Sequence, residues 1–355
     1  MKRPYRILLG ISLILGFAGW LSVDEIGRAL FERQIEQQVG WDLRDDLEAG
    51  LHVGFCGTGS PLPDPGRGGA CTFVIAGERV YLFDAGEGAA ESMALMGVLP
   101  SEVEAVFLTH FHSDHINGLG ALALQHVFRG SVSEPLPVYG GPGVERVVNG
   151  FNEAYALDHQ YRVEHIGKEA APAEGFELEA RPQTLNSSAL TTIFEQDGVR
   201  IGAFEVSHPS VLPAWGYRVD FGRRSVVISG DTTYTQALVD AARGADLLVH
   251  EALAPELVSY IELVARRYNH EGLALVMKSI PGYHASPADA VRAANEAGVT
   301  RLALTHLIPG LPNHMFDDLF TAGAEAAFNG DFWVVADGDV VTMPENSRVQ
   351  YLNVR

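Results

Sequence analysis

Three histidines and one aspartate stand within six residues in the segment His110-Phe-His112-Ser-Asp114-His115. Such a cluster is costly to bury unless each group has a partner. It directly follows the apolar run Ala105–Thr109, which is typical of a buried strand. Neutral imidazole and carboxylate ligands suit Zn²⁺ best, with Mn²⁺ or Fe²⁺ as alternatives. The spacing indicates that His110 and His112 bind one metal ion, while Asp114 and His115 face a second.

Other polar residues occupy the same kind of position, directly after a short apolar run. They are Asp84, Asp231, His250 and His306, which follow residues 80–83, 225–230, 246–249 and 301–305. Short runs rich in Val, Leu, Ile and Phe predict buried strands, and in α/β proteins chemistry collects where such strands end. We therefore expect these side chains to gather around the histidine-rich segment.

Amphipathic stretches lie between these runs and predict the helices of the fold. They cover residues 117–128, 142–157, 236–243, 255–268, 287–297 and 316–328. Three of them open with proline, which is favoured in the first turn of a helix. Because strands and helices alternate without a linker, we predict one α/β domain over residues 50–345, followed by a tail at 346–355. Two packed sheets with helices outside would fit this order.

The composition excludes several classes of protein. Acidic residues outnumber basic ones by 45 to 25, and the resulting net charge of −20 argues against a broadly basic nucleic-acid binder. A chain of 355 residues can bury a sizeable core without disulfides or structural metals. The composition favours a soluble, acidic α/β protein over a fibre, a disordered chain or a polytopic membrane protein.

The N-terminal segment differs from the rest of the chain. Lys2, Arg3 and Arg6 precede an apolar run over residues 7–23. This pattern predicts an uncleaved membrane anchor or a cleaved signal peptide over residues 1–23, with a buried helix as the remaining alternative. Residues 24–49 are then expected to form a juxtamembrane amphipathic helix and spacer. The catalytic domain is expected on the exported, extracytoplasmic side, or secreted if the signal is cleaved.

Cys56 and Cys71 are the two cysteines of the chain. They lie at the facing ends of two strand-like runs, Leu51–Cys56 and Cys71–Ala76, which a Gly/Pro-rich loop joins. If these strands pair, the sulfurs could come within bonding reach. A disulfide and two buried thiols both remain open, and neither cysteine has zinc-ligand spacing.

The motifs resemble those of the metallo-β-lactamase superfamily. The matching segments are His110-x-His-x-Asp-His115, Phe83-Asp-Ala-Gly86, Ser207-His-Pro209, Ser229-Gly-Asp-Thr232 and Leu304-Thr-His306, in this order along the chain. The resemblance covers residues 50–310 and implies a four-layer αββα sandwich. Further motifs are similar to the ribonuclease Z / arylsulfatase-like branch: Gly57-Thr-Gly-Ser60, Gly216-Tyr-Arg218, His250-Glu-Ala252 and His284-Ala-Ser286.

The resemblance implies a dinuclear site with two Zn²⁺ ions. One ion would be held by His110, His112 and His208, the other by Asp114, His115 and His306, with Asp231 bridging them. Asp84 would orient the ligands through hydrogen bonds. The two ions would bridge a hydroxide and clamp the oxygens of an in-line displacement.

Roles outside the ligand set also follow from the resemblance. His250 would donate a proton to the leaving group, with Glu251 beside it, and Asp114 would belong to the catalytic centre. His284 would contact the substrate anion or support His250, although both histidines could instead be structural. Trp215, close in sequence to His208, is expected to line the pocket.

The sequence departs from ribonuclease Z in one respect that bears on the substrate. Only 13 residues separate Tyr217 from Asp231, which leaves no room for the tRNA-gripping arm of that family. The motif at His250 also ends in Leu253, where the family usually has Thr. With the net acidity and the export segment, these departures predict a small anionic substrate and exclude tRNA as a partner. Homodimerisation is an expectation from the family alone.

The predicted function is a metal-dependent hydrolase of a phosphodiester or a sulfate ester. A hydrolase of carbonyl esters, lactones or thioesters is the alternative, because the same ligands could activate water for attack on a carbonyl carbon. A membrane-tethered binding module without catalysis is a third possibility. A missing ligand would favour it, and none of the seven predicted ligands is missing from the sequence.

Overall fold

The computed structural model describes residues 23–36, 39–128 and 132–355. The chain divides into two compact units, residues 1–46 and 47–355. In the first unit, residues 23–36 form a helix that is exposed along its length, and Leu43–Asp46 form the 3-10 turn η1. The second unit carries the sheets and the candidate site.

The predicted membrane anchor is not supported by the structure. Within residues 23–36, 39–128 and 132–355, no helix is long and apolar enough to cross a bilayer. Most of the apolar run behind the prediction lies outside the described part, which begins at Val23. The predicted anchor or signal segment, and the localisation built on it, are therefore not supported in the part of the chain that the structure describes.

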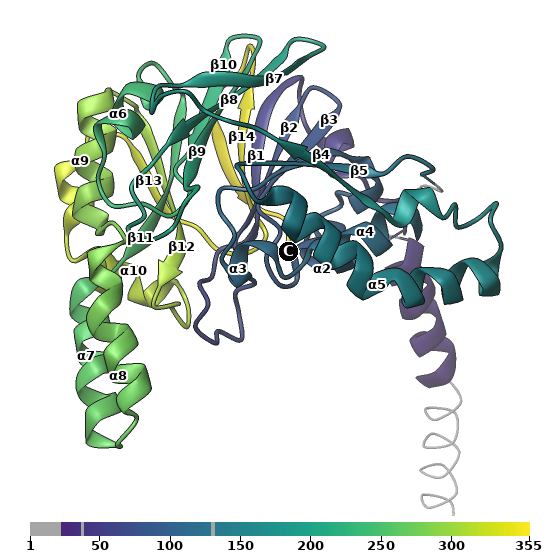
Figure 1. The fold of residues 1–355 in the computed structure, drawn as a ribbon, viewed down its shortest axis with the longest axis horizontal. Coiled ribbons are helices and arrows are strands. Elements are labelled where there is room, and N and C mark those ends of the chain that lie inside the picture. Colours follow the sequence, from purple (N-terminus) through teal and green to yellow (C-terminus); the bar gives the residue numbers. More distant parts are fainter. Residues whose placement is uncertain (1–22, 37–38, 129–131) are drawn as a thin grey trace, which may run out of the picture. The chain divides into compact units, whose positions relative to one another are not determined.

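The second unit contains two sheets (Figure 1). The first has the order β15-β14-β1-β2-β3-β4-β5-β6 and the second the order β13-β12-β11-β10-β9-β8-β7. The strands of the first sheet are β1 (Gly50–Gly57), β2 (Cys71–Ala76), β3 (Arg79–Phe83), β4 (Val103–Phe107), β5 (Leu136–Gly140), β6 (Leu178–Pro182), β14 (Asp339–Pro344) and β15 (Gln350–Asn353). Those of the second are β7 (Thr191–Gln196), β8 (Val199–Glu205), β9 (Trp215–Phe221), β10 (Arg224–Ile228), β11 (Leu247–Leu253), β12 (Arg301–Ile308) and β13 (Asp331–Val334). The expected C-terminal tail thus contains β15, which pairs antiparallel with β14.

Helices cover the outer faces of the two sheets. On the side of the first sheet lie α2 (Ala89–Leu95), α4 (Leu119–Phe128) and α5 (Val144–Ile166), and on the second lie α6 (Gln236–Ala242) and α9 (Pro287–Ala297). The helices α7 (Pro255–Arg267) and α8 (Glu271–Ser279) form a hairpin that extends beyond the sheet layers (Figure 1). The short α10 (Asp317–Thr321) follows β12. The predicted four-layer αββα sandwich is confirmed.

The core between the two sheets is built from their inward-facing side chains. Phe107 of β4 is fully buried at its centre. Its ring stacks on Phe83 and Tyr139 at centroid distances of 5.3 and 4.9 Å, and Tyr217 of the second sheet meets it edge-on at 5.8 Å. Buried aromatic rings contribute large apolar areas, so this cluster holds the two sheets together.

Local sequence signals explain the helix that follows the predicted residue His284. Ser286 and Asp289 form a capping box, in which each side chain accepts a hydrogen bond from the other residue's backbone N–H. Pro287 occupies the first turn, and Gly298 ends the helix with φ 72°. These signals place the start of α9 three residues after His284.

Some elements differ from the sequence-based predictions. The stretch 316–328 was expected to be one helix, but Ala322 and Gly323 have positive φ and break it into α10 and a short 3-10 turn, Ala324–Ala327. Helix α8 was not predicted. Cys56 and Cys71 are joined by a disulfide that links β1 to β2, which decides between the two alternatives left open.

We expect Phe107→Ala to lower the free energy of unfolding by about 3–5 kcal/mol, because it opens a cavity in the aromatic cluster. Urea unfolding followed by circular dichroism measures this change. Leu157→Ala, at an α5 side chain that is 62% exposed, is the control and should change the free energy by less than about 0.5 kcal/mol. An equal effect of both substitutions would contradict the role assigned to Phe107.

Candidate metal centre

The histidine-rich segment lies at the carboxyl end of β4 in the first sheet. His110 lies three residues after the end of β4, and the short helix α3 (Ser113–Ile116) carries Asp114 and His115. The segment is pinned to the loop after β3, because the Ala85 N–H donates to the His115 carbonyl oxygen at 2.8 Å. Gly86 is required there, since a Cβ at this position would overlap the backbone of Asp114. The sequence motifs around Asp84 and His110 therefore form one packed unit.

The second sheet supplies the remaining predicted ligands. His208 follows β8 and Asp231 follows β10. His306 belongs to β12, where Glu251 pairs with Thr305 but Ala252 pairs with Leu307, so His306 is the extra residue of a β-bulge. Its φ of 47° lies in the left-handed region, which is rare for a residue with a side chain. Bulges re-aim side chains beside active sites, and this one turns His306 toward Asp231.

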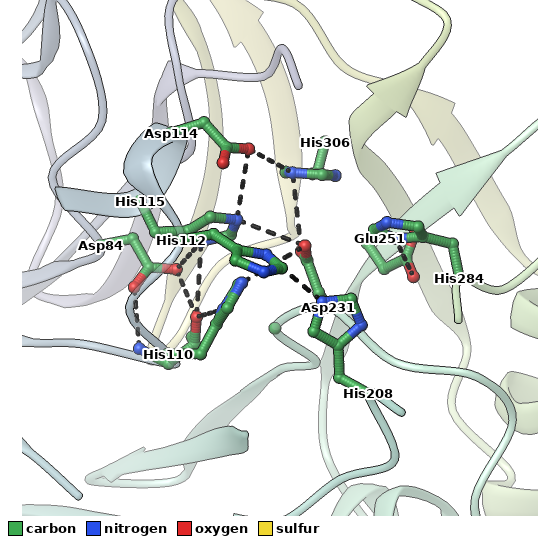
Figure 2. A network of polar contacts seen from close by, with 12 residues as sticks. Asp84, His110, His112, Asp114, His115, His208, Asp231, Glu251, His284 and His306 are labelled. Atoms are coloured by element: carbon green, nitrogen blue, oxygen red, sulfur yellow. Dashed lines mark hydrogen bonds and ion pairs between the residues drawn. The ribbon is translucent and has the colours of Figure 1, made fainter. Parts of the chain in front are cut away.

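The predicted ligands fall into two adjacent groups, as Figure 2 shows. The first consists of His110, His112, His208 and Asp231, and the second of Asp114, His115 and His306. Within each group, the candidate ligand atoms lie within 4.8 Å of one another. The spacing of the sequence motifs therefore brings all seven residues to one place.

Asp231 lies between the two groups. Its Oδ2 is 3.7 Å from His110 Nε2 and 3.4 Å from His115 Nε2. Its Oδ1 is 3.6 Å from His306 Nε2 on the other side. This carboxylate therefore occupies the position that the resemblance assigned to a bridging ligand.

The chemistry of these donors fits bound metal ions. His110 Nε2, His115 Nε2 and Asp231 Oδ1 are buried without a hydrogen-bond partner, which is rare in folded proteins. In two of the candidate ligands, the Nδ1 atom makes a hydrogen bond away from the centre. His208 Nδ1 donates to the Tyr283 carbonyl oxygen at 2.9 Å, and His115 Nδ1 donates to Asp84 at 2.7 Å. Such outer hydrogen bonds leave the Nε2 lone pairs directed at the shared centre.

The pKa values of these groups follow from burial and mutual charge. Burial lowers the pKa of His110 well below its usual range, and the neighbouring His115 adds to this effect. Burial alone would lower the pKa of His115, but Asp231 and Asp84 outweigh it and raise that pKa well above its usual range. The two carboxylates therefore favour the protonated form of His115, whereas burial favours the neutral form of His110.

Asp84 organises the first-sheet side of the centre. Its backbone has φ 59°, and its N–H donates to the Phe107 carbonyl oxygen at 3.0 Å. The carboxylate accepts from the Thr109 N–H and hydroxyl, both at 2.8 Å, and from His115 Nδ1. These contacts orient His115 and match the role predicted for Asp84.

Glu251 and His284 form a buried pair beside the two ligand groups (Figure 2). Glu251 Oε1 accepts from His284 Nδ1 and the Ala285 N–H, both at 3.0 Å, and from the Thr232 N–H at 3.1 Å. The His284 ring lies nearly parallel to that of His306, with centroids 5.7 Å apart. His284 also lies close enough to Asp231 and His306 to share a metal ion with them.

The structure does not place His250 in this cluster. Successive side chains of a strand point to opposite faces, and Glu251 faces the centre. His250 lies on the helix-covered face, where Leu248 and Ala252 pack in the core formed with α6 and α9. It is fully buried, and its Nδ1 contacts the Glu251 carbonyl oxygen at 2.6 Å. Strand alternation therefore separates the two halves of the His250-Glu251 motif.

Trp215 is likewise not found at the candidate site. It is 2% exposed and belongs to the core between the sheets. It lines a cavity of about 320 Å³ formed with residues such as Leu185, Leu212 and Pro213. Among the described residues, the pocket beside the metal ligands is lined instead by His112, Asp114, Asp231, Tyr283, His284 and residues of α8.

Two residues of the centre were missed by the sequence analysis. Thr109 holds Asp84 with its backbone and hydroxyl, and Tyr283 holds His208 with its carbonyl oxygen. Thr109 could have been noticed as the last residue of its apolar run. Tyr283 acts through its backbone, for which no side-chain signal exists.

Comparisons with known proteins agree with this geometry. Residues 79–307 match the family model described as "Beta-lactamase superfamily domain". Ribonuclease Z of Mycobacterium bovis (strain BCG / Pasteur 1173P2) is 34% identical over 263 residues, which cover 74% of this chain and 87% of the relative. Ribonuclease Z of Mycobacterium marinum is 33% identical over 282 residues, which cover 79% of this chain and 94% of the relative.

Solved structures show the same fold. Human tRNase Z, short form, superposes with a TM-score of 0.59 at 21% identity and covers 82% of this chain and 99% of that one. The metallo-beta-lactamase fold protein YhfI of Bacillus subtilis gives a TM-score of 0.56 at 21% identity. The match covers 82% of this chain and 98% of that one.

The comparisons overturn one prediction about partners. The sequence analysis excluded tRNA, yet the relatives that match most of this chain are named ribonuclease Z. The observation behind the exclusion still holds, because β9 and β10 are joined directly by the turn at residues 222–223. A missing arm at this position is therefore no ground for excluding RNA, and the exclusion was wrong.

Asp84→Asn should weaken Zn²⁺ binding by about 10–100-fold, because it removes the charged acceptor that orients His115. Competition with a chelator of known affinity measures this. Asp197→Asn is the matched control, at a carboxylate of the β7–β8 turn that is 57% exposed. Unchanged zinc affinity in Asp84→Asn would contradict the assigned role.

Proposed function

Because the chain belongs to the metallo-β-lactamase superfamily, we propose that it is a metal-dependent hydrolase that cleaves phosphodiester bonds with two zinc ions, for which Mn²⁺ or Fe²⁺ could substitute. The observation that carries the proposal is the pair of ligand groups around Asp231. The names of the relatives support phosphodiester chemistry over the sulfate-ester option.

The ligand groups assign the metal-binding roles. His110, His112 and His208 would hold one ion, Asp114, His115 and His306 the other, and Asp231 would contact both. Two ions held in this way lower the pKa of a water molecule and stabilise charge on the phosphate oxygens. His112 is exposed, so the phosphate can approach from its side of the centre.

His284 is the best-placed proton donor for the leaving group. Cleavage breaks the bond between phosphorus and the leaving oxygen, which then needs a proton unless it is a stable anion. Burial alone would lower the pKa of His284, but the charge of Glu251 and its hydrogen bond outweigh burial and raise the pKa to about 9. His284 also lines the pocket beside Asp114 and Asp231. We therefore assign to His284 and Glu251 the role first predicted for His250.

His250 then acts on Glu251 from the opposite face of β11. Its pKa is lowered by burial, so the ring is neutral at pH 7 and its Nδ1–H can donate to the Glu251 carbonyl oxygen. This contact positions the backbone of Glu251, whose carboxylate holds His284. In this proposal, His250 is a positioning residue.

Asp231→Ala should abolish hydrolysis of bis(p-nitrophenyl) phosphate by the zinc-loaded protein, because it removes the ligand shared by both groups. Asp240→Ala, at an exposed α6 carboxylate, should retain full turnover. The substrates compared would be this diester, a transfer RNA transcript, p-nitrophenyl sulfate and a simple lactone. Lactone turnover without diester or RNA cleavage would overturn the proposal in favour of carbonyl chemistry.

His284→Ala should lower kcat by about 10²–10⁴-fold for a diester with an alkyl leaving group, and much less for one with p-nitrophenolate, which leaves without a proton. Glu251→Gln should shift the alkaline limb of the kcat profile to lower pH, because the charge that raises the His284 pKa is lost. Both effects are measured by steady-state kinetics across pH 6–10. Equal losses with both leaving groups would contradict proton donation.

A further inference from the structure

The pocket beside the metal ligands has two chemically different sides. Its volume is about 120 Å³. One side carries the metal-centre residues His112, Asp114, Asp231 and His284. The other side, here called the apolar wall, consists of Leu62, Val276, Met277, Ile280 and Ile308. The mechanism proposed above uses only the first side.

Part of the apolar wall has a structural role. Met277, Ile280 and Ile308 are almost fully buried and pack with Leu253 and Val258 in a small core that holds the α7–α8 hairpin against the second sheet. Packing therefore explains these three residues. Leu62 is partly buried against the same core, so packing leaves only Val276 at the open edge of the wall unexplained.

Val276 is the most informative residue of this edge. It is 47% exposed and, unlike its more exposed neighbour Leu275, it lines the pocket. Leu273, which is 39% exposed, lies on the same face of α8 three residues earlier, and Ile280 follows four residues later. Apolar surface thus runs from the outside of the hairpin into the pocket.

The apolar wall itself carries no cationic side chain. Among the described residues, none that lines the pocket is Lys or Arg. The ring of Tyr283 adds a further flat surface, with its centroid 5.0 Å from that of His284.

We propose that the apolar wall binds an uncharged alkyl or aryl group of the substrate, next to the phosphate that lies at the metal centre. The inference rests on the proposed function, and it adds one uncharged group of the substrate to the phosphate contacted at the metal centre. Each methylene that leaves water for such a surface contributes roughly fourfold in affinity (about 0.8 kcal/mol).

The test uses the zinc-loaded full chain and the methyl, butyl and octyl esters of p-nitrophenyl phosphate. We expect kcat/KM to rise by about tenfold or more from the methyl to the octyl ester, because several methylenes reach the wall. In Val276→Asp, the ratio of octyl to methyl turnover should fall to about one, since a charge in the wall repels the chain. Leu275→Asp is the matched control: Leu275 is 62% exposed on another face of α8 and should keep the ratio.

A flat series in the unaltered protein, with diester turnover intact, would overturn the inference and leave the proposed function standing. The same rise in Val276→Asp as in the unaltered protein would also overturn it. If no ester is hydrolysed, the proposed function fails, and calorimetric binding of methylphosphonate and octylphosphonate decides the inference. Tighter octyl binding that is lost in Val276→Asp supports the apolar wall, and equal binding contradicts it.

Discussion

The structure of the candidate site depends on one buried carboxylate, that of Asp231. An ionised carboxylate is stable in the interior only if positive charge or hydrogen-bond donors surround it. Burial would raise the pKa of Asp231, but His306 and His115 outweigh it and hold that pKa well below its usual range. His306 belongs to β12 of the second sheet, and His115 lies in α3, which follows β4 of the first sheet. The requirement to surround Asp231 therefore ties the first sheet to the second at the edge where their strands end.

Local backbone strain serves the same requirement. Asp84 and His306 both have positive φ, a conformation that costs residues with a Cβ about 1–3 kcal/mol. At Asp84, the hydrogen bonds from Thr109 and His115 offset this cost. At His306, the bulge is held by the pairing of β11 with β12 on both sides of it. The strained backbone positions are thus His306, a candidate ligand, and Asp84, which orients the candidate ligand His115.

The gathering of most candidate ligands could be predicted from the sequence because strand ends meet at a common edge, whereas His208 was added by the resemblance to the metallo-β-lactamase superfamily. Asp84, His110 and Asp231 each follow a short apolar run, and the sheets bring these run ends together. The role of His250 could not be predicted, because its motif does not show which of two adjacent residues faces the centre. Trp215 was misplaced for a related reason: nearness to His208 in sequence does not show that its ring turns into the core.

The α7–α8 hairpin contains a helix that the sequence pattern did not predict. Helix α8 was missed because Leu273, Leu275 and Val276 spread apolar residues around the helix and hide the single stripe of an ordinary surface helix. Of these three exposed residues, only Val276 lines the pocket beside the metal ligands. Val276 is the residue to which we assign a contact with the substrate. In the function proposed for this chain, the ligands around Asp231 carry out the chemistry and the hairpin after β11 contributes to the choice of ester.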